Sequence, residues 1–525
     1  MLKRLTCIVT TLTIAAVLVA GLFILLNTQA AVAEGDLPDM DALGRYHFEY
    51  GTPQGWIAQP GESQPGITIT VTATTAPVWT GNYSLRVGVI SDTVGAWWAA
   101  ADVDNPAPGM TPTGTLTARL SLPATSSTAT WAQLYILDHD WDWSNSPTVT
   151  LQTGDWVTLT WDLTGTAFVC PIHRFGVQFG GTATGPLNDA LYLDAIGWSQ
   201  PTYTQTIYTG AYLSGTWTAN FTNELDCLDD AGSKNTGLIN VFVGWTSPFP
   251  TSIVNTILCH KSTPLITWEP WVPLADIAAG VYDDYIDAWS QAISQTQSTV
   301  FLRWGHEMNG CIPGNVPPCW YTWGGDPVNY VAAWRHIHDR METTNGVRNV
   351  VWVWTPNITQ GDLFTDYPDY YPGDDYVDWV GASGFNTAQK AWWDPKPTCF
   401  TFDDLFSPIL YDMTDRYPKP QMVAEFASAC DNGCDQALWI SEAYHQALFY
   451  PRLQALVWFN VAKWEGEGAQ REWVDWRIGC GDCDTPACPD CVAAYAQALA
   501  NPRYSDGAPG SIACKLYLPL ILKNR

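Results

Sequence analysis

The distribution of apolar and polar residues divides the chain into two regions with different periods. From about Arg45 to Trp198, short runs alternate apolar and polar residues, and Gly, Pro, Ser and Thr separate the runs. Because no helical period is visible, this region predicts an antiparallel β-sandwich. Its seven predicted strands are Ile67–Ala73, Ser84–Ile90, Leu116–Leu122, Thr130–Leu137, Trp156–Leu163, Arg174–Phe179 and Ala190–Ile196.

The second region follows a Thr- and Tyr-rich joint at residues 199–206 and alternates strand-like runs with helical segments, which is typical of α/β architecture. Its eight predicted strands are Tyr208–Leu213, Leu238–Trp245, Pro264–Trp268, Val300–Gly305, Val350–Trp354, Trp379–Phe385, Gln421–Phe426 and Ala455–Asn460. The clearest helices are Asp283–Thr296, Pro327–Glu342, Phe402–Arg416 and Leu438–Leu448.

Eight strand–helix repeats in about 270 residues match the size of a (β/α)8 TIM barrel. A doubly wound sheet is the competing topology, but no Gly-rich phosphate fingerprint follows the first strands. The predicted fold class is therefore multidomain, with a β-sandwich at residues 45–200 followed by an α/β TIM barrel at residues 203–478.

The N-terminus has the pattern of an export signal. Lys3 and Arg4 precede an apolar run from Ile8 to Leu26, and Ala31-Val32-Ala33 offers a small-residue cleavage site. We expect residues 1–33 to be a signal peptide and the protein to be extracellular or on the cell surface. The run is long enough that an uncleaved anchor helix is the alternative.

Composition narrows the class of partner. The chain has 24 Lys and Arg against 52 Asp and Glu, a net charge of -28, which argues against a nucleic-acid ligand. It also has 29 Trp, 23 Tyr and 17 Phe, and exposed aromatic rings stack on the C–H faces of neutral sugars. Most of these rings fill cores in any protein. We therefore expect a neutral polysaccharide ligand and a monomeric protein.

The stretch Val300–Gly310 carries the strongest candidate chemistry. An apolar strand runs directly into a polar and aromatic cluster that contains Glu307, and Glu425 ends the predicted seventh strand. Strand C-termini form the catalytic face of a TIM barrel, so the two glutamates would face each other across its mouth. Two carboxyl groups are what glycosidic bond cleavage requires. The alternative for Glu307 is a structural ion pair with Arg303.

At these residues the chain resembles glycoside hydrolase family 26, a family of β-mannanases with some β-1,3-1,4-glucanases and β-1,3-xylanases. Arg303-Trp304-Gly305-His306-Glu307-Met308-Asn309-Gly310 is similar to the family's acid/base motif. Further matches follow in order at residues 266–271, 333–336, 351–357, 371–374, 377–381, 423–425 and 457–460. The resemblance spans about residues 206–477.

The resemblance implies a retaining double displacement, with Glu307 as acid/base and Glu425 as nucleophile about 5 to 5.5 Å apart. The residues expected to contact the sugar or support the pair are His306, Trp458, Arg303, Asn386, Phe385, Trp268, Trp320 and Trp323. Trp458 would form a stacking floor, with a core-capping Trp as the alternative, and His306 has the alternative of a rim histidine bonded to backbone.

One position departs from the family pattern. Several members have Tyr in a Gly-Tyr-Asn segment after strand six, where its hydroxyl bonds the nucleophile, whereas this chain has Gly384-Phe385-Asn386. Phe385 offers no donor, so we expect Asn386 and Arg303 to hold Glu425 instead.

The first region resembles jelly-roll carbohydrate-binding modules that accompany glycoside hydrolases. Trp98, Trp141 and Trp143 are candidate sugar-stacking residues there, with a place in the sandwich core as the alternative. Glu49 and Asp194 match positions that share a structural calcium in such modules, and carboxylate oxygens suit that cation. Two surface carboxylates without an ion are the alternative.

Thirteen cysteines follow Cys7 of the predicted signal, and in an exported chain they predict disulfides with one cysteine unpaired. Cys311 with Cys319, and Cys430 with Cys434, are candidate staples of loops after the two catalytic strands. The tail at residues 479–525 holds Cys480, Cys483, Cys488 and Cys491, whose spacing favours disulfides over zinc. Its apolar end, Leu516–Leu522, is too short to span a bilayer.

Together these features predict an exported endo-β-glycanase that acts on plant-type β-mannan and needs no cofactor for catalysis. Structural calcium in the first domain is the candidate metal. A β-1,3-1,4-glucanase or β-1,3-xylanase is the alternative within enzymes. A surface glycan-binding protein with an inactive barrel is the alternative outside them. The two glutamates argue against that last alternative.

Overall fold

The protein is described from a computed structural model, and the sandwich and the barrel are each built as the sequence predicts. The described residues are 40, 44–92, 94–104, 114–126, 128–166, 168–169, 172–198, 203–311, 319–358, 367–387, 399–430, 432–465, 471–479, 481–482, 485–486 and 488–510. The predicted signal or anchor at residues 1–33 and the apolar end at 516–522 lie outside them. Among the helices described, none combines the length and the apolar character needed to span a membrane.

Two antiparallel sheets form the sandwich. The strands of the first, in spatial order, are β1 (Trp56–Ala58), β4 (Gly95–Asp104), β10 (Arg174–Ala183), β6 (Ala129–Leu137) and β7 (Trp143–Asn145), and β8 (Val149–Thr150) also pairs with β6. Those of the second are β2 (Thr68–Thr74), β3 (Ser84–Ser91), β11 (Leu187–Trp198), β5 (Thr115–Ser121) and β9 (Trp156–Asp162). Inward residues of both sheets share one apolar core.

All seven strands predicted for this region are present, but the sequence prediction missed β1, β4, β7 and β8. Strand β4 is the informative omission because it is central to its sheet. It reads Gly-Ala-Trp-Trp-Ala-Ala-Ala-Asp-Val-Asp, so Ala stands on both faces and the polarity barely alternates. Alanine is also a weak strand former, and only pairing with β10 over the whole strand defines β4.

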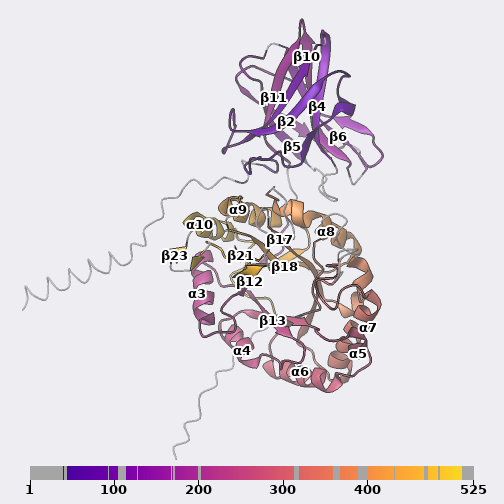
Figure 1. The fold of residues 1–525 in the computed structure, drawn as a ribbon, viewed down its shortest axis with the longest axis vertical. Helices are drawn as coiled ribbons and strands as arrows, with labels where there is room; N and C mark the ends of the chain where they lie inside the picture. The colour runs from indigo at the N-terminus through magenta and orange to yellow at the C-terminus, as the bar shows by residue number, and fades with distance from the viewer. Residues whose placement is uncertain are drawn as a thin grey trace, which may run out of the picture. The chain divides into compact units, whose positions relative to one another are not determined.

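Eight parallel strands close into the predicted barrel, and helices surround it (Figure 1). The strands are β12 (Tyr208–Leu213), β13 (Leu238–Gly244), β14 (Thr263–Glu269), β15 (Val300–Trp304), β16 (Val350–Trp354), β17 (Trp379–Asn386), β18 (Gln421–Ser428) and β19 (Leu453–Asn460). The helices are α3 (Phe221–Gly232), α4 (Thr251–Cys259), α5 (Leu274–Ala278), α6 (Asp283–Thr296), α7 (Pro327–His338), α8 (Phe402–Arg416), α9 (Gln436–Ala447) and α10 (Pro489–Leu499).

The predicted helix Pro327–Glu342 begins as expected and then changes type. Asp326 caps α7 by accepting a hydrogen bond from the Asn329 amide at 3.1 Å, with Pro327 at the first helical position. After His338 the chain continues as a π-helix over Asp339–Thr344. Such a widened turn leaves no signal in an apolar periodicity.

The two faces of each barrel strand contact different parts of the domain. Large tryptophans point outward onto the helices: Trp268 lies between Trp245 and Trp289, with ring centroids 4.4 and 4.0 Å away, and Trp304 packs on Trp334 of α7. Alternate residues point inward, and at the bottom of the barrel they form a dry cluster. That cluster comprises Leu238, Leu265, Phe301, Val353, Met422, Ala424, Ala455 and Val457.

The disulfides agree only partly with the predicted pairing. Cys311 is bonded to Cys319 as expected, but Cys434 is bonded to Cys399 rather than to Cys430. Cys430 is itself disulfide-bonded, as are Cys227 and Cys259. The predicted Cys430–Cys434 staple is therefore wrong, because Cys434 has Cys399 as its partner. The backbone amide of Cys430, just past β18, donates to Asp475 O at 2.7 Å. In the tail, Cys488 is bonded to Cys491, which agrees with the prediction of disulfides in place of a zinc site.

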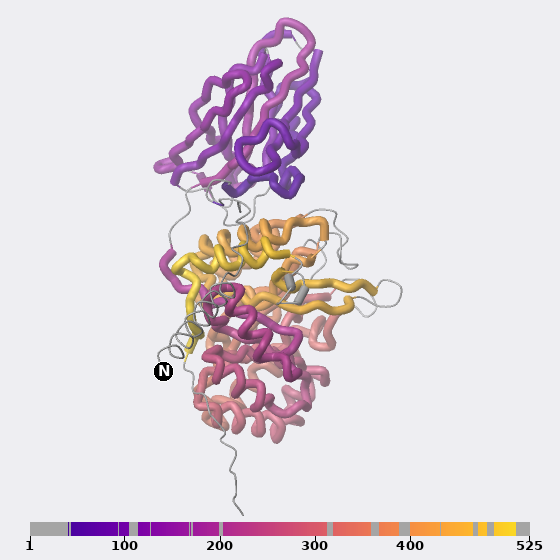
Figure 2. The backbone as a smooth tube through the Cα atoms, turned by 90° about the vertical axis from the view of Figure 1, so that its left-hand side faces the viewer, coloured from indigo at the N-terminus to yellow at the C-terminus, as the bar shows by residue number. Residues whose placement is uncertain are grey.

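Two short hairpins follow the last barrel strand. The first pairs β20 (Ala462–Glu465) with β21 (Glu472–Asp475), and Figure 2 shows it projecting from the barrel. The second pairs β22 (Gly481–Asp482) with β23 (Thr485–Pro486) and precedes α10.

Candidate active site

A layer of polar side chains lies above the apolar floor of the barrel and is centred on Arg303 of β15. Its guanidinium donates hydrogen bonds to Thr355 Oγ1 at 2.5 Å, to Thr267 Oγ1 at 3.2 Å and to Ser383 Oγ at 2.7 Å. Its Nη1 also donates to Glu425 Oε1. These partners stand on four other strands, so a single buried arginine ties β14, β16, β17 and β18 together beneath the mouth.

Glu425 is the anionic partner of that arginine. It lies on β18 at the barrel mouth and is 5% exposed. The strands β17 and β18 change register between Ala382 and Ser383, which brings Ser383 opposite Glu425. Arg303 donates to Glu425, and none of its hydrogen bonds in the described residues goes to Glu307. The alternative of a structural ion pair between Arg303 and Glu307 is therefore wrong.

Glu307 lies just past β15 in an unusual backbone conformation. Its φ is 52° and that of Gly305 is 54°, both in the left-handed region, which costs free energy for a residue with a Cβ. The Glu307 amide donates to Thr355 O at 2.9 Å, which fixes the turn to β16. A reciprocal pair between Asn309 and Asn357, at 2.8 and 3.0 Å, holds the next turn in the same way.

The surroundings of Glu307 favour its protonated form. The side chain is 7% exposed, and burial together with the nearby charge of Glu425 raises its pKa from 4.5 to about 7. Arg303 and a hydrogen bond with Asn357 oppose that rise. Glu425 faces a guanidinium, which is the environment of a base. Glu307 is buried without such a partner, which is the environment of an acid.

His306, between Gly305 and Glu307, is buried. Burial and the charge of Arg303 hold its pKa well below 6.5. Its Nδ1 has no hydrogen-bond partner among the described residues, and its ring faces Tyr321 at 4.9 Å and Phe242 at 5.7 Å. A buried nitrogen without a partner at the mouth of a barrel is available to a sugar hydroxyl.

An aromatic loop follows Glu307. Trp320 is 41% exposed, and Tyr321 stacks on Trp323 with centroids 4.3 Å apart and planes 5° apart. Trp323 is fully buried and donates from Nε1 to His306 O at 2.7 Å, so it supports the loop rather than presenting a free face. Of the two tryptophans predicted to line subsites here, only Trp320 is accessible.

Two other predicted substrate contacts, Trp268 and Trp458, do not face the barrel mouth. Trp268 is fully buried among aromatic rings outside the strands. Trp458 is also fully buried, packs on Phe426 and Trp439, and donates to Trp476 O at 2.8 Å, so it offers no stacking floor. Both tryptophans point outward from their strands toward the helices, whereas the prediction placed them at the mouth. For Trp458, the core-capping alternative is the arrangement found.

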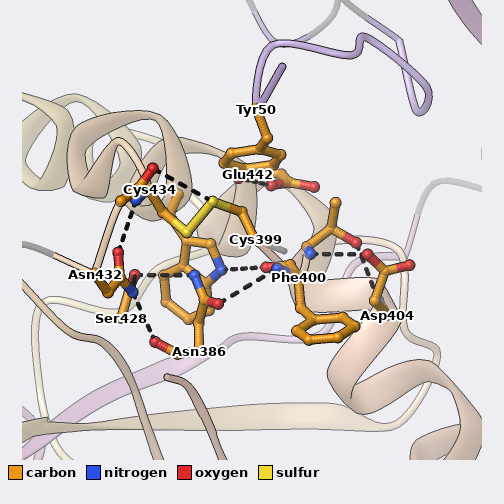
Figure 3. The surroundings of a disulfide bond; sticks show 12 residues. Tyr50, Asn386, Cys399, Phe400, Asp404, Ser428, Asn432, Cys434 and Glu442 are labelled. Atoms are coloured by element: carbon orange, nitrogen blue, oxygen red, sulfur yellow. Dashed lines mark hydrogen bonds between the residues drawn. A yellow bond between two sulfur atoms is a disulfide. The ribbon is translucent and has the colours of Figure 1, made fainter. Parts of the chain in front are cut away.

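Asn386 does not hold Glu425. Its amide donates to Ser428 Oγ at 3.0 Å and its Oδ1 accepts from the Phe400 amide at 3.3 Å (Figure 3). Asn432 and the Cys399–Cys434 disulfide lie in the same network, which joins the loops after β17 and β18. Of the two residues predicted to hold Glu425, Arg303 alone does so.

Phe385 lies at the mouth, where its ring packs on Phe459 at 5.4 Å and on Trp476 at 5.1 Å. Its place on β17 is the inward one, two residues after Ser383. Phe385 therefore presents an apolar ring at the mouth and no hydrogen-bond donor.

Several mouth residues were not predicted from sequence: Tyr212, Thr267, Glu269, Trp271, Tyr321, Thr355, Asn357 and Ser383. The inward positions among them could have been found by counting in steps of two from the apolar floor, since Leu265, Thr267 and Glu269 share one face of β14. Tyr321 and Trp271 lie in loops, where no such period applies.

The sandwich carries a second group of aromatic residues on the outer face of its first sheet. Trp98 is 39% and Trp143 37% exposed, and Trp143 stacks on Tyr135 with centroids 4.2 Å apart. Between them runs a row of hydrogen-bonded amides, in which Asn145 donates to Gln133 at 3.3 Å and Gln133 donates to Gln178 at 3.0 Å.

Trp141 lies beside this row, in the loop between β6 and β7. It is 53% exposed and its ring stacks on His173 at 4.1 Å. The three predicted tryptophans are thus exposed, whereas Trp97 faces the core.

Both carboxyl groups of the predicted calcium pair accept backbone amides. The oxygens of Glu49 accept from the amides of Asn82 and Tyr83 at 2.7 and 2.9 Å, and those of Asp194 from Trp79 and Ala195 at 2.8 and 2.7 Å. Burial raises the Asp194 pKa to about 6, and the charge of Glu49 contributes to that rise. In the part of the chain that the structure describes, no three His, Cys, Asp or Glu side chains gather as ligands.

Comparison with known proteins matches both regions to families. Residues 277–396 match the family described as glycosyl hydrolase family 26, and residues 46–195 match the mannanase galactose-binding domain-like family. The first match includes β15, Glu307 and the aromatic loop, and the second covers almost the whole sandwich.

Individual relatives are more distant. Endoglucanase H of Acetivibrio thermocellus is 30% identical over 305 residues, which cover 56% of this chain and 31% of that protein. Mannan endo-1,4-β-mannosidase A and B of Caldalkalibacillus mannanilyticus is 26% identical over 150 residues, or 26% of this chain and 24% of that protein. The chain thus spans about a third or less of these relatives. A solved ruminal family 26 endo-β-1,4-mannanase matches 79% of this chain and 90% of its own, with 12% identity and a TM-score of 0.43.

Proposed function

Because the barrel carries a glycosyl hydrolase family 26 domain, we propose that this protein is an exported endo-acting glycoside hydrolase that cleaves internal β-1,4-mannosidic bonds of mannan, glucomannan or galactomannan. The observation that carries the proposal is the pair of buried carboxyls, Glu307 and Glu425, at the C-terminal ends of β15 and β18, with opposite electrostatic surroundings. Hydrolysis by this pair uses only side chains and water.

In the first step, Glu425 attacks the anomeric carbon of the sugar while Glu307 donates its proton to the departing glycosidic oxygen. The bond from the anomeric carbon to that oxygen breaks as the bond to the Glu425 carboxylate forms, which gives a covalent glycosyl-enzyme. Arg303 positions Glu425 for this attack, since its guanidinium donates directly to the attacking carboxylate.

In the second step, water enters and Glu307, now ionised, removes a proton from it. The resulting attack on the anomeric carbon releases Glu425, and the sugar leaves with the configuration it had in the polymer. Proton cycling fits the pair, because esterification of Glu425 removes the neighbouring charge that raises the Glu307 pKa.

The mannan assignment is supported by the family match of the sandwich and by a partial sequence match to a mannan endo-1,4-β-mannosidase. In this proposal the exposed tryptophans and the amide row of the sandwich hold the polymer near the barrel, since indole faces stack on pyranose rings and amides bond their hydroxyls. Export through residues 1–33 would place the enzyme where such polymers occur.

The test is turnover on a panel of soluble mannan, glucomannan, lichenan, xylan and β-1,3-xylan, with release of reducing ends and product anomers read by NMR. We expect the highest kcat/KM on a mannan and a retained anomeric configuration. Glu425→Ala is expected to lose activity on every substrate. Full activity in Glu425→Ala would refute the nucleophile assignment, and inverted products would refute the double displacement.

A second candidate is a β-1,3-1,4-glucanase on the same barrel. It is favoured by endoglucanase H, the relative with the longest aligned segment reported above, and by Phe385 in place of the family's tyrosine. Faster turnover of lichenan than of any mannan would select it. The catalytic pair and its chemistry are the same in both candidates.

A further inference from the structure

A third carboxyl group faces the barrel mouth and the proposed mechanism does not use it. Glu269 ends β14, whose inward face carries Leu265 in the apolar floor and Thr267 in the polar layer. The period of two places Glu269 one level higher, above Thr267 and toward the catalytic pair. Its outward neighbour, Trp268, packs against the helices instead.

Glu269 is close enough to Glu425 and Arg303 for their charges to act on it. Burial raises the pKa of Glu269, and the charge of Glu425 raises it further, while Arg303 and Lys463 lower it. Conversely, the charges of Glu269, Glu307 and Glu425 all act on the Tyr321 hydroxyl. Glu269 therefore lies within the same mouth and not on the outer surface of the barrel.

One oxygen of Glu269 holds an exposed indole. Oε2 accepts a hydrogen bond from Trp271 Nε1 at 3.2 Å, and Trp271 is 49% exposed. The indole also packs edge-on against Trp323 at 4.9 Å and against Tyr321 at 5.9 Å, so its position is fixed from two sides. Among the described residues, Oε1 of Glu269 makes no hydrogen bond, and the carboxyl is half-buried.

We propose that Glu269 and Trp271 form a sugar-binding subsite next to the cleavage point, in which Trp271 stacks on one pyranose ring and Glu269 Oε1 bonds a hydroxyl of that sugar. The inference rests on the proposed function and adds to it a residue pair that determines substrate specificity. A hydrogen-bonded carboxyl recognises a hydroxyl in a particular orientation, which an indole face alone does not.

The same arrangement selects a neutral glycan. Three carboxyls face one mouth, Arg303 is committed to Glu425, and Lys463 forms an ion pair with Glu465 at 3.0 Å. A uronic acid in this subsite would meet a carboxylate without a cation to offset it. Unsubstituted hexose or pentose units are the sugars that fit.

The experiment compares Glu269→Ala and Trp271→Ala on a mannohexaose, a cello- or mixed-linkage hexasaccharide and an activated aryl glycoside that fills only the cleavage site. Each substitution should lower kcat/KM on its preferred hexasaccharide by about 10- to 100-fold, in line with loss of a charge-assisted hydrogen bond or a stacked ring. Turnover of the aryl glycoside should change by less than about threefold. The double variant should lose less than the product of the single losses, since both side chains contact one sugar.

Glu342 provides a matched control. Its Oε1 accepts from Trp352 Nε1 at 2.7 Å, so it forms the same kind of carboxyl–indole bond, but on the outward face of β16. Glu342→Ala should leave the dependence on substrate length unchanged. An equal loss for Glu269→Ala on the aryl glycoside and the hexasaccharide would overturn the subsite, because Glu269 would then act on the catalytic pair.

Calorimetric titration separates this inference from the proposed function. In a Glu425→Ala background, hexasaccharide binding should weaken about tenfold or more when Trp271→Ala or Glu269→Ala is added. Unchanged affinity would overturn the subsite even if the wild-type protein hydrolyses mannan. Weakened affinity in a protein that hydrolyses no glycan would support the subsite and overturn the proposed function.

Discussion

At the scale of single residues, the Glu307 carboxyl sets the expected pH dependence. It must be protonated to donate to the leaving oxygen, and its pKa is raised to about 7 by burial and by Glu425. Activity is therefore expected below that pKa and lost as the pH rises through it. We expect the alkaline limb of kcat/KM to fall with an apparent pKa near 7.

The check uses Glu307→Ala with an aryl glycoside whose leaving group needs no proton. That variant should lose about 10²- to 10⁴-fold on a polysaccharide, retain glycosylation of the aryl substrate, and lose the alkaline limb. Added azide should restore turnover by attacking the glycosyl-enzyme. An alkaline limb that persists in Glu307→Ala would assign the titration to another group.

Arg303 gives a second prediction at this scale. Its fork spans four strands and reaches Glu425, which the point charge of a lysine cannot reproduce. We expect Arg303→Lys to fold but to lose about 10²- to 10³-fold in kcat, comparable to removing one well-placed donor from an active site. Arg340→Lys, at a forked pair with Asp287 on the surface, is the matched control and should keep wild-type kcat. Equal kcat for Arg303→Lys and wild type would refute the role of Arg303.

The positions of the Glu307 and Glu425 carboxyls at the barrel mouth were predictable from sequence. Glu307 and Glu425 each follow an apolar run, and strand ends of a barrel meet at one face. The failures at Trp268 and Trp458 have a common cause. A tryptophan near the end of a barrel strand can point either into the mouth or outward into the aromatic layer under the helices. Only its odd or even position along the strand distinguishes these two orientations.

At the scale of elements, the barrel strands were predictable to within two residues at almost every end, since buried parallel strands are continuous apolar runs. The Ala-rich strand β4 and the π-helix at Asp339–Thr344 were not, because pairing and tertiary packing define them rather than a residue pattern. The Cys399–Cys434 bond was also hidden, since 35 residues separate its ends and sequence does not fix pairing.

The Cys311–Cys319 disulfide carries a prediction about the aromatic loop. A Cβ at Gly324 would lie 2.9 Å from Cys311 Sγ, and one at Gly325 would lie 2.9 Å from Cys319 Sγ, so the turn after Trp323 is packed directly on the sulfur atoms. We expect a Cys311→Ser/Cys319→Ser variant to raise KM several-fold with a smaller change in kcat, because the loop presents Trp320 and Tyr321.

A Cys488→Ser/Cys491→Ser variant, beside α10, is the control for losing a disulfide as such and should keep wild-type KM. Steady-state kinetics on a soluble glycan at matched protein concentration measures both variants. A KM equal to wild type in the Cys311→Ser/Cys319→Ser variant would show that the loop keeps its geometry without the bond.

At the scale of the whole molecule, the sandwich and the barrel are expected to contribute separable activities. Trp98→Ala and Trp143→Ala remove exposed rings from the outer sheet face and leave the barrel unchanged. We expect each variant to bind insoluble mannan several-fold more weakly, and to lose activity on insoluble but not on soluble substrate. Pull-down and paired assays measure both effects.

Trp97→Phe, inside the sandwich core, is a control for altered packing of the same strand. Reduced turnover of soluble oligosaccharides in Trp143→Ala would argue that the sandwich takes part in catalysis, whereas undiminished binding in the double Trp98→Ala/Trp143→Ala variant would place the polymer-binding face elsewhere.

The left-handed backbone at Glu307 has a consequence for the stability of the chain. The residue combines an unfavourable φ with a buried carboxyl whose pKa is raised, so ionising it opposes folding as the pH rises from about 4.5 through 7. Glu307→Asn tolerates that φ and removes the charge, so it should raise Tm, and by more at pH 8 than at pH 4. If Glu307 is the proposed acid/base, the chain carries at this position a stability cost that only the reaction would justify.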